Sequence, residues 1–327
     1  MHRPSAVRRA LLALLLACGL LSALPSPEVA AFGRAAYPAQ SQGNRGSDVR
    51  AIQYLLRARG YDLTVSGFYG PGTRSVVRAF QSSLGLPMTG VVGSDTWPRL
   101  VRRLRTGDSG DAVRALQLEL NEKHAAGLSL SGDFGPGTRA AVLRFQDHAG
   151  IQQTGEADAA TWRNLVWHYE YPAFGRSELC DYEVGNGSAH WGTGASIGQL
   201  ESAAALFHGR GYGPMSIGDV SLQHGGDIAL HATHEQGMDA DVRPIKRDGG
   251  QCATYGGTNW RSSTYSRPAT RALIQDIRAR SWGHLKLIYF NDPVLIDEGL
   301  TTRYTGHDDH LHVRFCEAEH ALAMYRC

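Results

Sequence analysis

Two stretches in the first half of the chain repeat one another, and this duplication restricts the possible folds more than any other feature of the sequence. The offset between matching blocks is 64 residues in the first block and 65 in the other two. Matching at so constant a spacing indicates a duplicated structural unit. The matching blocks are residues 46–56, 66–81 and 89–100 in the first copy, and residues 110–120, 131–146 and 154–165 in the second.

Each copy has the pattern of a small helical domain. Apolar side chains in 49–56 recur at helical spacing, and a Gly-Pro-Gly sequence then interrupts the chain before a second helix. A third, short helix is expected to bury Trp97 in the first copy and Trp162 in the second. The sequence therefore predicts two all-α three-helix modules, at residues 45–102 and 106–168.

The D-V-R-x-[IL]-Q opening and the G-x-[FY]-G-P-x-T-R centre of these copies resemble the peptidoglycan-binding domain of the three-helix type. The resemblance covers both copies nearly completely. It implies peptidoglycan as a partner and attachment to the cell wall, where two copies would add avidity on a repetitive surface. The alternative is that the repeats are generic scaffolding.

The N-terminus has the composition of a secretory signal peptide. Three arginines precede an apolar run from Ala10 to about Leu24, and small residues follow. The run of about 15 residues is shorter than the roughly 20 that a membrane-spanning helix needs. We predict a signal peptide at residues 1–31 and hence a secreted, cell-wall-associated protein. A retained anchor and a lipoprotein are the alternatives, because residues 16–18 loosely resemble a lipobox.

Four cysteines remain if Cys18 leaves with the signal peptide. An even number of cysteines in an exported chain predicts two disulfide bonds. The sequence permits three pairings. We favour the pairing Cys180–Cys327, which would tie the ends of one domain together, with Cys252–Cys316 inside it.

The overall charge excludes one class of partner. The chain has 33 basic and 31 acidic residues, for a formal net charge of +2. Neither the bulk charge nor any interleaving of basic and aromatic residues points to nucleic acid. We also expect no membrane association once the signal peptide is removed, and the sequence leaves the oligomeric state open.

The second half of the chain, residues 178–327, is rich in glycine and short strand patterns, with one clear helix at 268–280. Ahead of that helix, His234 and Asp241 lie seven residues apart. A helix would separate them by about 10.5 Å along its axis, which is too far for one small ion. A loop-to-strand segment bent at Gly237 would bring them together; otherwise they are unrelated surface groups.

Residues 306–315, GHDDHLHVRF, contain a second group of histidines. Polar and apolar residues alternate from His310 onward, which predicts a strand with His310, His312 and Arg314 on one face. A single histidine is more often a hydrogen-bonded side chain than a metal ligand. Two imidazoles that point into the same cleft make a ligand role more probable.

Together these histidines and aspartates resemble the metal-binding pattern of zinc peptidases that act on peptidoglycan and D-alanyl termini. The penicillin-insensitive murein endopeptidases of the MepA type are most similar, because H-x-x-H-x-x-G-x-D-x-D occupies 231–241 and H-x-x-H-x-H occupies 307–312. Carboxypeptidase and dipeptidase relatives usually have alanine in place of Asp239. The resemblance covers about 178–327 and implies an α+β zinc peptidase domain with an antiparallel sheet.

The resemblance also implies one zinc ion per chain, held by His234, Asp241 and His312. Three nitrogen and oxygen ligands leave one position open, as in catalytic rather than structural zinc sites. The H-E-x-x-H helix site of other zinc proteases is absent.

Four further residues receive roles from the same resemblance. His310 is expected to stabilise the oxyanion or transfer a proton, and His307 is the second candidate for the general base. His231 and Asp239 are expected to orient the zinc ligands from behind.

The resemblance thus implies an exported zinc metallo-endopeptidase that hydrolyses D-Ala–diaminopimelate cross-links of peptidoglycan. A zinc D-Ala-D-Ala carboxypeptidase shares the metal and the fold, so the ligands do not distinguish the two. A non-catalytic wall-binding protein is the third possibility, and it predicts that ligands are missing.

Overall fold

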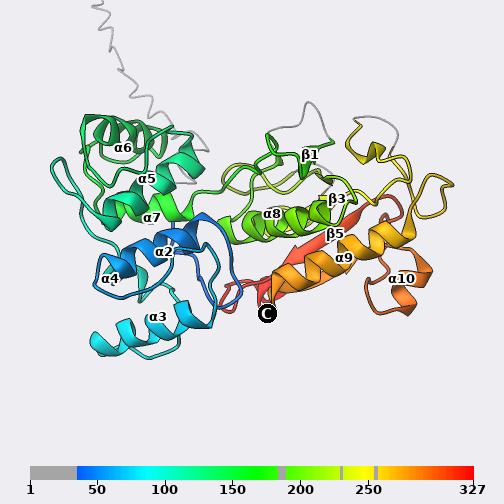
Figure 1. Cartoon of the computed structure of the whole chain (residues 1–327), viewed down its shortest axis with the longest axis horizontal. Coiled ribbons are helices and arrows are strands. Elements are labelled where there is room, and N and C mark those ends of the chain that lie inside the picture. Colours follow the sequence, from blue (N-terminus) through cyan, green and yellow to red (C-terminus); the bar gives the residue numbers. More distant parts are fainter. Residues whose placement is uncertain (1–34, 183–188, 229–230, 254–256) are drawn as a thin grey trace, which may run out of the picture.

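Helices make up the first half of the protein, and a mixed sheet lies in the second half (Figure 1). The computed structural model describes residues 35–182, 189–228, 231–253 and 257–327. The predicted signal peptide lies outside the described residues. Within the described part of the chain, no helix is both long enough and apolar enough to cross a bilayer.

The two predicted modules each contain three helices. Trp97 and Trp162 are fully buried, as the sequence predicted, and their indole nitrogens donate to the carbonyls of Pro38 and Arg102 at 2.8 Å. The helices of the first module are α2 (Ser47–Arg57), α3 (Pro71–Ser83) and α4 (Trp97–Leu100), and those of the second are α5 (Asp111–His124), α6 (Pro136–His148) and α7 (Ala159–Trp167).

The glutamines that mark the repeat hold each module together from inside. Gln53 Nε2 donates to Thr73 Oγ1 at 3.0 Å, and Gln117 Nε2 donates to Thr138 Oγ1 at 3.1 Å. All four of these side chains are buried. Because buried polar groups need partners, these repeat residues fix the loop between the first two helices of each module. The glutamine and threonine recur in both copies because each pair of side chains holds its module together.

Helices α2 and α5 pack against each other, and the buried apolar side chains of both modules form one continuous core. A buried cation reinforces this junction. Lys123 Nζ lies 2.7 Å from Asp48 Oδ1, 3.7 Å from Glu119 Oε2 and 3.9 Å from Glu170 Oε1. Since a charge buried at 1% exposure needs counter-charges, this network joins the first module, the second module and the segment after α7.

The second half contains a five-stranded sheet in the order β1-β2-β3-β5-β4. The predicted fully antiparallel sheet is wrong in one pair, because β1 and β2 run parallel while the other pairs are antiparallel. The reason is the crossover: helix α8 (Gly194–Gly209) connects β1 to β2, and a parallel pair needs such a connection. The strands are β1 (Leu179–Asp181), β2 (Met215–Ile217), β3 (Asp239–Val242), β4 (Leu285–Tyr289) and β5 (Leu311–Phe315).

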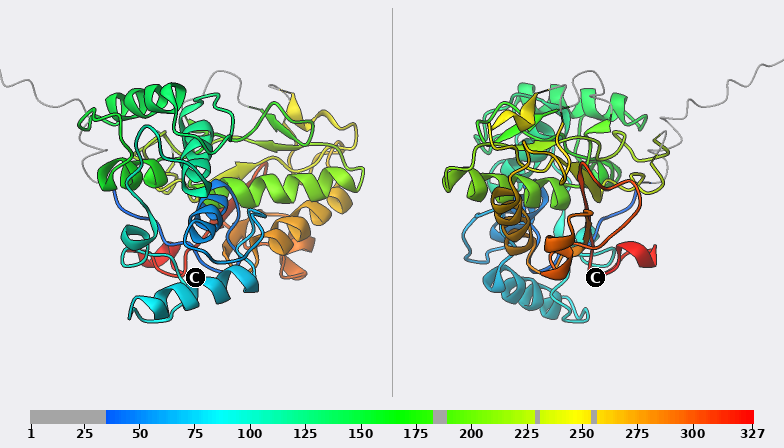
Figure 2. Two further views of the ribbon diagram at one scale, coloured as in Figure 1. Left: turned by 60° about the vertical axis from the view of Figure 1, so that its left-hand side comes forward. Right: turned by 90° about the vertical axis from the view of Figure 1, so that its right-hand side faces the viewer.

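Helices α8 and α9 (Arg267–Ser281) run side by side over one face of this sheet (Figures 1 and 2). Helix α9 matches the predicted helix at 268–280 to within one residue at each end. Leu311, Val313 and Phe315 of β5 join the apolar core under these helices. Because side chains alternate along a strand, His312 and Arg314 lie on the opposite face, away from α8 and α9. Helix α10 (Pro293–Asp297) follows β4.

The helical half and the sheet half touch through a close backbone approach. Helix α2 contacts α8, and a Cβ atom added to Gly198 would lie only 2.7 Å from the backbone of Gly46. Gly198 therefore has to be a glycine for the first module to dock on α8. The rings of Phe68 and Trp282 stack beside it with centroids 4.9 Å apart.

The described residues contain two disulfide bonds, as predicted, but the favoured pairing is wrong. Cys180 pairs with Cys252, and Cys316 pairs with Cys327. Cys252 ends a short 3₁₀ turn that packs on β2, next to Cys180 in β1. The last residues fold back on the end of β5, so that Cys327 N donates to the carbonyl of Glu317 at 2.9 Å. Each disulfide thus joins a cysteine in or next to a strand to a segment that packs beside that strand.

Candidate metal centre

Three side chains from distant parts of the sequence place one ligand atom each around a common point. His234 Nε2 lies 3.2 Å from His312 Nδ1 and 3.4 Å from Asp241 Oδ1, and His312 Nδ1 lies 3.3 Å from Asp241 Oδ1. In a tetrahedral site with zinc–ligand distances of about 2.0–2.1 Å, ligand atoms are about 3.3–3.4 Å apart. The triangle has the dimensions of one face of such a tetrahedron.

The sheet and one glycine bring these three residues together. Asp241 in β3 lies directly opposite His312 in β5 in the antiparallel register. His234 comes from the loop before β3, and Gly237 turns the chain into the strand with a φ of +65°. Of the two possibilities that the seven-residue spacing left open, the structure has the bent loop-to-strand segment.

The ring nitrogens that face away from the triangle are engaged by oxygen atoms. His234 Nδ1 lies 3.0 Å from the carbonyl oxygen of Val220, and His312 Nε2 lies 2.8 Å from Asp239 Oδ1. An imidazole N–H donates to such an acceptor, so the lone pair is left on the opposite nitrogen. The opposite nitrogen of each ring therefore faces the triangle. Burial acts to lower the pKa of His312, but hydrogen bonds to Asp239 and Asp241 raise it to about 9, so a metal ion has to displace a proton from this ring.

Asp239 links His312 to two more side chains. Its Oδ1 accepts from Arg314 Nε at 2.7 Å, and its Oδ2 accepts from the Tyr325 hydroxyl at 2.5 Å. Burial acts to raise the pKa of Asp239, but hydrogen bonding and charge from His312, with the charge of Arg314, hold it below its ordinary value. The carboxylate is thus anionic. The strand alternation placed Arg314 on the correct face, whereas no sequence pattern marked Tyr325.

The fit of a metal ion rests on Asp241. Its Oδ1 is buried and has no hydrogen-bond partner among the described residues. Burial acts to raise the pKa of Asp241, but the His234, His312 and His310 rings lower it far below its usual range, so the group is a carboxylate. A buried anionic oxygen beside two imidazole nitrogens suits a cation, and this donor set suits zinc.

His231 lies beside the triangle, next to the other oxygen of Asp241. Its Nδ1 lies 3.8 Å from Asp241 Oδ2, and its Nε2 lies 3.0 Å from Asp219 Oδ2. The ligand atoms of His231, His234 and Asp241 are all within 4.8 Å of one another. Asp219, which orients His231, carried no recognisable sequence pattern.

His310 lies just before β5, at the open side of the triangle. Its Nε2 is 3.8 Å from Asp241 Oδ1, and its Nδ1 is 2.9 Å from Asp309 Oδ1. Burial acts to lower the pKa of His310, but Asp309 and Asp241 outweigh it and raise the pKa above its ordinary value. Asp309, to which the sequence assigned no role, thus orients His310 and favours its protonated form.

His307 stacks near His310, with ring centroids 4.7 Å apart. Its Nδ1 lies 3.0 Å from the carbonyl oxygen of Thr305. Burial lowers the pKa of His307, and the neighbouring His310 lowers it further. The two histidines at the mouth of the site therefore have pKa values shifted in opposite directions.

A cleft of about 500 Å³ opens over the triangle, with Tyr289, Tyr304 and Met324 in its walls. A second hollow of about 470 Å³, lined in part by Arg243 and Asn259, lies on the other side of Asp241. His231, Asp241 and His310 line both hollows. The candidate site thus adjoins two hollows that share three of its side chains.

Comparison with known proteins supports both halves. The model of the peptidoglycan binding domain family matches residues 45–100 and 109–165, inside the two predicted modules. A zinc D-Ala-D-Ala carboxypeptidase of Streptomyces albus G is 27% identical over 209 residues, which cover 59% of this chain and 79% of that protein.

Other similarities are confined to shorter stretches. An uncharacterized protein of Kitasatospora aureofaciens is 46% identical over 63 residues, 19% of this chain and 53% of that protein. A peptidoglycan-binding protein structure from Clostridioides difficile is 33% identical, with 19% of this chain and 40% of that chain covered and a TM-score of 0.19. A Burkholderia AP3 phage endolysin structure is 26% identical, with 39% and 60% covered and a TM-score of 0.20.

The chain therefore contains two peptidoglycan-binding domain repeats and is related to a protein named as a zinc D-Ala-D-Ala carboxypeptidase.

Proposed function

We propose that this protein is an exported zinc endopeptidase that hydrolyses D-Ala–diaminopimelate cross-links of peptidoglycan, held on the wall by its two binding repeats. The observation that carries the proposal is the triangle of ligand atoms from His234, Asp241 and His312, with edges of 3.2–3.4 Å. The carboxypeptidase relative and the peptidoglycan-binding repeats support the substrate class. The two described disulfides suit an oxidising compartment outside the cytoplasm.

When bound, zinc would supply a Lewis acid that activates water and polarises the scissile carbonyl. The chain's own groups divide the proton transfers. His310, with its raised pKa and its Asp309 partner, suits the role of the acid that donates to the oxyanion or the departing amine. His307, with its lowered pKa, is neutral there and accepts a proton from water. Asp239 holds His312 with its Nδ1 lone pair toward the site.

The form of the cleft favours cleavage within a cross-link over removal of a terminal residue. A carboxypeptidase needs room for one residue beyond the scissile bond, whereas a cross-link continues on both sides. The hollow of about 500 Å³ and the hollow of about 470 Å³ flank the site, with His310 between them. A carboxypeptidase is the second candidate activity, because the relative that matches over 209 residues is named as a zinc D-Ala-D-Ala carboxypeptidase.

One experiment separates these activities. Wild type, His312→Ala and the exposed control His208→Ala are purified, their zinc content is measured, and each digests cross-linked muropeptide dimers. We expect wild type and the control to bind zinc and to convert dimers to monomers, and His312→Ala to do neither. Release of free D-alanine from monomers with intact dimers would instead identify a carboxypeptidase. Absence of zinc and of both products in wild type would leave a wall-binding protein without catalysis.

A further inference from the structure

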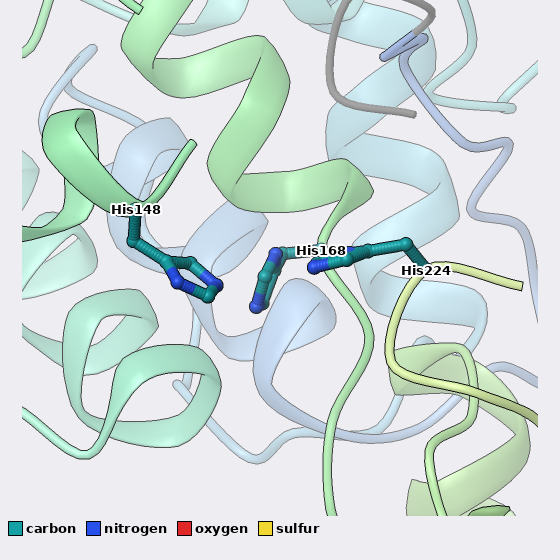
Figure 3. A group of neighbouring side chains, drawn as sticks. All are labelled: His148, His168 and His224. Atoms are coloured by element: carbon teal, nitrogen blue, oxygen red, sulfur yellow. The ribbon is translucent and has the colours of Figure 1, made fainter. Parts of the chain in front are cut away.

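Three histidines gather where the second repeat meets the sheet half, away from the site described above. His148 ends α6, His168 directly follows α7, and His224 comes from the segment between β2 and β3. Figure 3 shows His168 between the other two, with the three rings turned toward one another. Each offers a ring nitrogen, and these nitrogens all lie within 4.8 Å of one another.

The surroundings hold the central ring in place and cover the cluster with aromatic side chains. His168 is 1% exposed, and its carbonyl accepts from the buried Lys123 Nζ at 2.9 Å, which fixes the backbone there. Trp167 stacks on His224 with an interplanar angle of 10°, and Phe145 meets His168 edge-on with centroids 5.8 Å apart. Aromatic walls of this kind limit the access of water to the nitrogens that they surround.

The protonation of the cluster also suits a ligand role. Burial lowers the pKa of His168 well below its ordinary value and that of His224 to about 4, and neighbouring histidines add to both shifts. These two imidazoles are therefore neutral at pH 7, each with a lone pair. Metal binding there does not have to displace a proton from either ring.

We propose that His148, His168 and His224 form a second metal site, for a divalent late transition ion such as Zn²⁺, that joins the second repeat to the sheet half. An all-imidazole donor set suits Zn²⁺, Cu²⁺ or Ni²⁺ rather than Mg²⁺ or Ca²⁺. Tetrahedral zinc would need nitrogens about 3.3 Å apart, so they must close by up to about 1.5 Å. Side-chain rotation of His148 and His224, which are only partly buried, can supply that movement.

Such an ion would act on the arrangement of the two halves. His148 belongs to the second peptidoglycan-binding repeat, and His168 directly follows the last helix of that repeat. His224 belongs to the segment that carries Val220, whose carbonyl oxygen lies 3.0 Å from His234 Nδ1. The ion would therefore tie the wall-binding repeat to the segment that supports the candidate zinc ligand. The competing interpretation is that the cluster is aromatic packing alone, which predicts no metal.

The test counts metal ions in the full chain, using Zn²⁺ as the probe. Metal-free wild type, His224→Ala, His148→Gln, His312→Ala and the exposed control His208→Ala are titrated against a chromophoric chelator. We expect two equivalents in wild type and His208→Ala, and one equivalent in each of the other three. The double variant His312→Ala with His224→Ala should bind none with comparable affinity.

A second readout guards against misfolding. Added Zn²⁺ should raise the midpoint of thermal unfolding of His312→Ala, and this rise should vanish when His224→Ala is added. One equivalent in wild type that His224→Ala and His148→Gln both keep would overturn the proposal. Loss of an equivalent in His224→Ala but not in His312→Ala would support this site while contradicting the proposed catalytic one, so the two proposals fail separately.

Discussion

Replacing Asp239 by asparagine removes the carboxylate that orients His312 while it leaves all three candidate zinc ligands in place. The carboxylate accepts from His312, Arg314 and Tyr325 at 2.8, 2.7 and 2.5 Å. An amide can present its NH₂ group to His312 Nε2. The ring would then carry its proton on Nδ1, the atom that faces Asp241.

The magnitude follows from these contacts. Loss of a group that orients a metal ligand typically weakens metal binding about 10- to 100-fold, which is about 1.4–2.7 kcal/mol. Arg314, which is 7% exposed, also loses its counter-charge, and an uncompensated buried charge costs about 3–5 kcal/mol of folding free energy. Tyr325→Phe keeps the Asp239 carboxylate and removes one hydrogen bond to it. We therefore expect it to lower the folding free energy by about 1.5–3 kcal/mol at most, less than the loss in Asp239→Asn.

The assay is competition for zinc with a chromophoric chelator, followed by dimer hydrolysis with zinc in excess. We expect the zinc affinity of Asp239→Asn to fall about 10- to 100-fold, that of Tyr325→Phe to fall less, and that of the exposed control Asp297→Asn to stay unchanged. Excess zinc should restore part of the activity of Asp239→Asn. Wild-type zinc affinity in a folded Asp239→Asn protein would refute the assigned role of this carboxylate.

Three further predictions concern stability and the C-terminus. Burial, reinforced by Asp48, raises the pKa of Glu317 from 4.5 to about 8, so the folded state holds this proton more tightly than the unfolded chain. The associated stability is fully present below about pH 4.5 and is lost as the pH rises to about 8. Glu317→Gln has no carboxyl group to titrate, so between these pH values its free energy of unfolding in urea should fall by about 2–5 kcal/mol less than that of wild type. Lys123→Met leaves buried carboxylates without their cation and should lower the free energy of unfolding by about 3–5 kcal/mol; an undiminished value would contradict the proposed junction. Cys327→Ser frees the segment that carries Tyr325 to Asp239, and chelator competition should show a several-fold loss of zinc affinity, whereas an unchanged affinity would show that this disulfide does not support the site.

Local sequence patterns predicted the helical half. Helix spacing, the Gly-Pro-Gly break and the repeated tryptophans act within a few residues of one another, so their consequences follow without knowledge of the rest of the chain. Each predicted module has its three helices, and both tryptophans are buried. The helix at 268–280 was predictable for the same reason, since its boundaries depend on Pro268 and local periodicity.

Part of the candidate site was predictable from the sequence, and part depends on the tertiary structure. The resemblance to zinc peptidases singled out His234, Asp241 and His312, but their joint geometry depends on the pairing of β3 with β5 and on the bend at Gly237. The contacts with His312 join residues more than seventy positions apart, and only the folded chain can make them. The roles of these three residues remain predictions until zinc is measured.

Other features had no local pattern to reveal them. The parallel pair β1–β2, the pairing of Cys316 with Cys327 and the reach of Tyr325 to Asp239 all depend on which segments the sheet brings side by side. The cluster of His148, His168 and His224 is the clearest case, since three separate elements supply one ring each. The sequence by itself determined the repeated helices, because these follow from short-range spacing, whereas the candidate ligands came from the resemblance of two short motifs to a known family. Only the tertiary structure decided which distant side chains share a site, because that depends on strand register and on how the two halves pack.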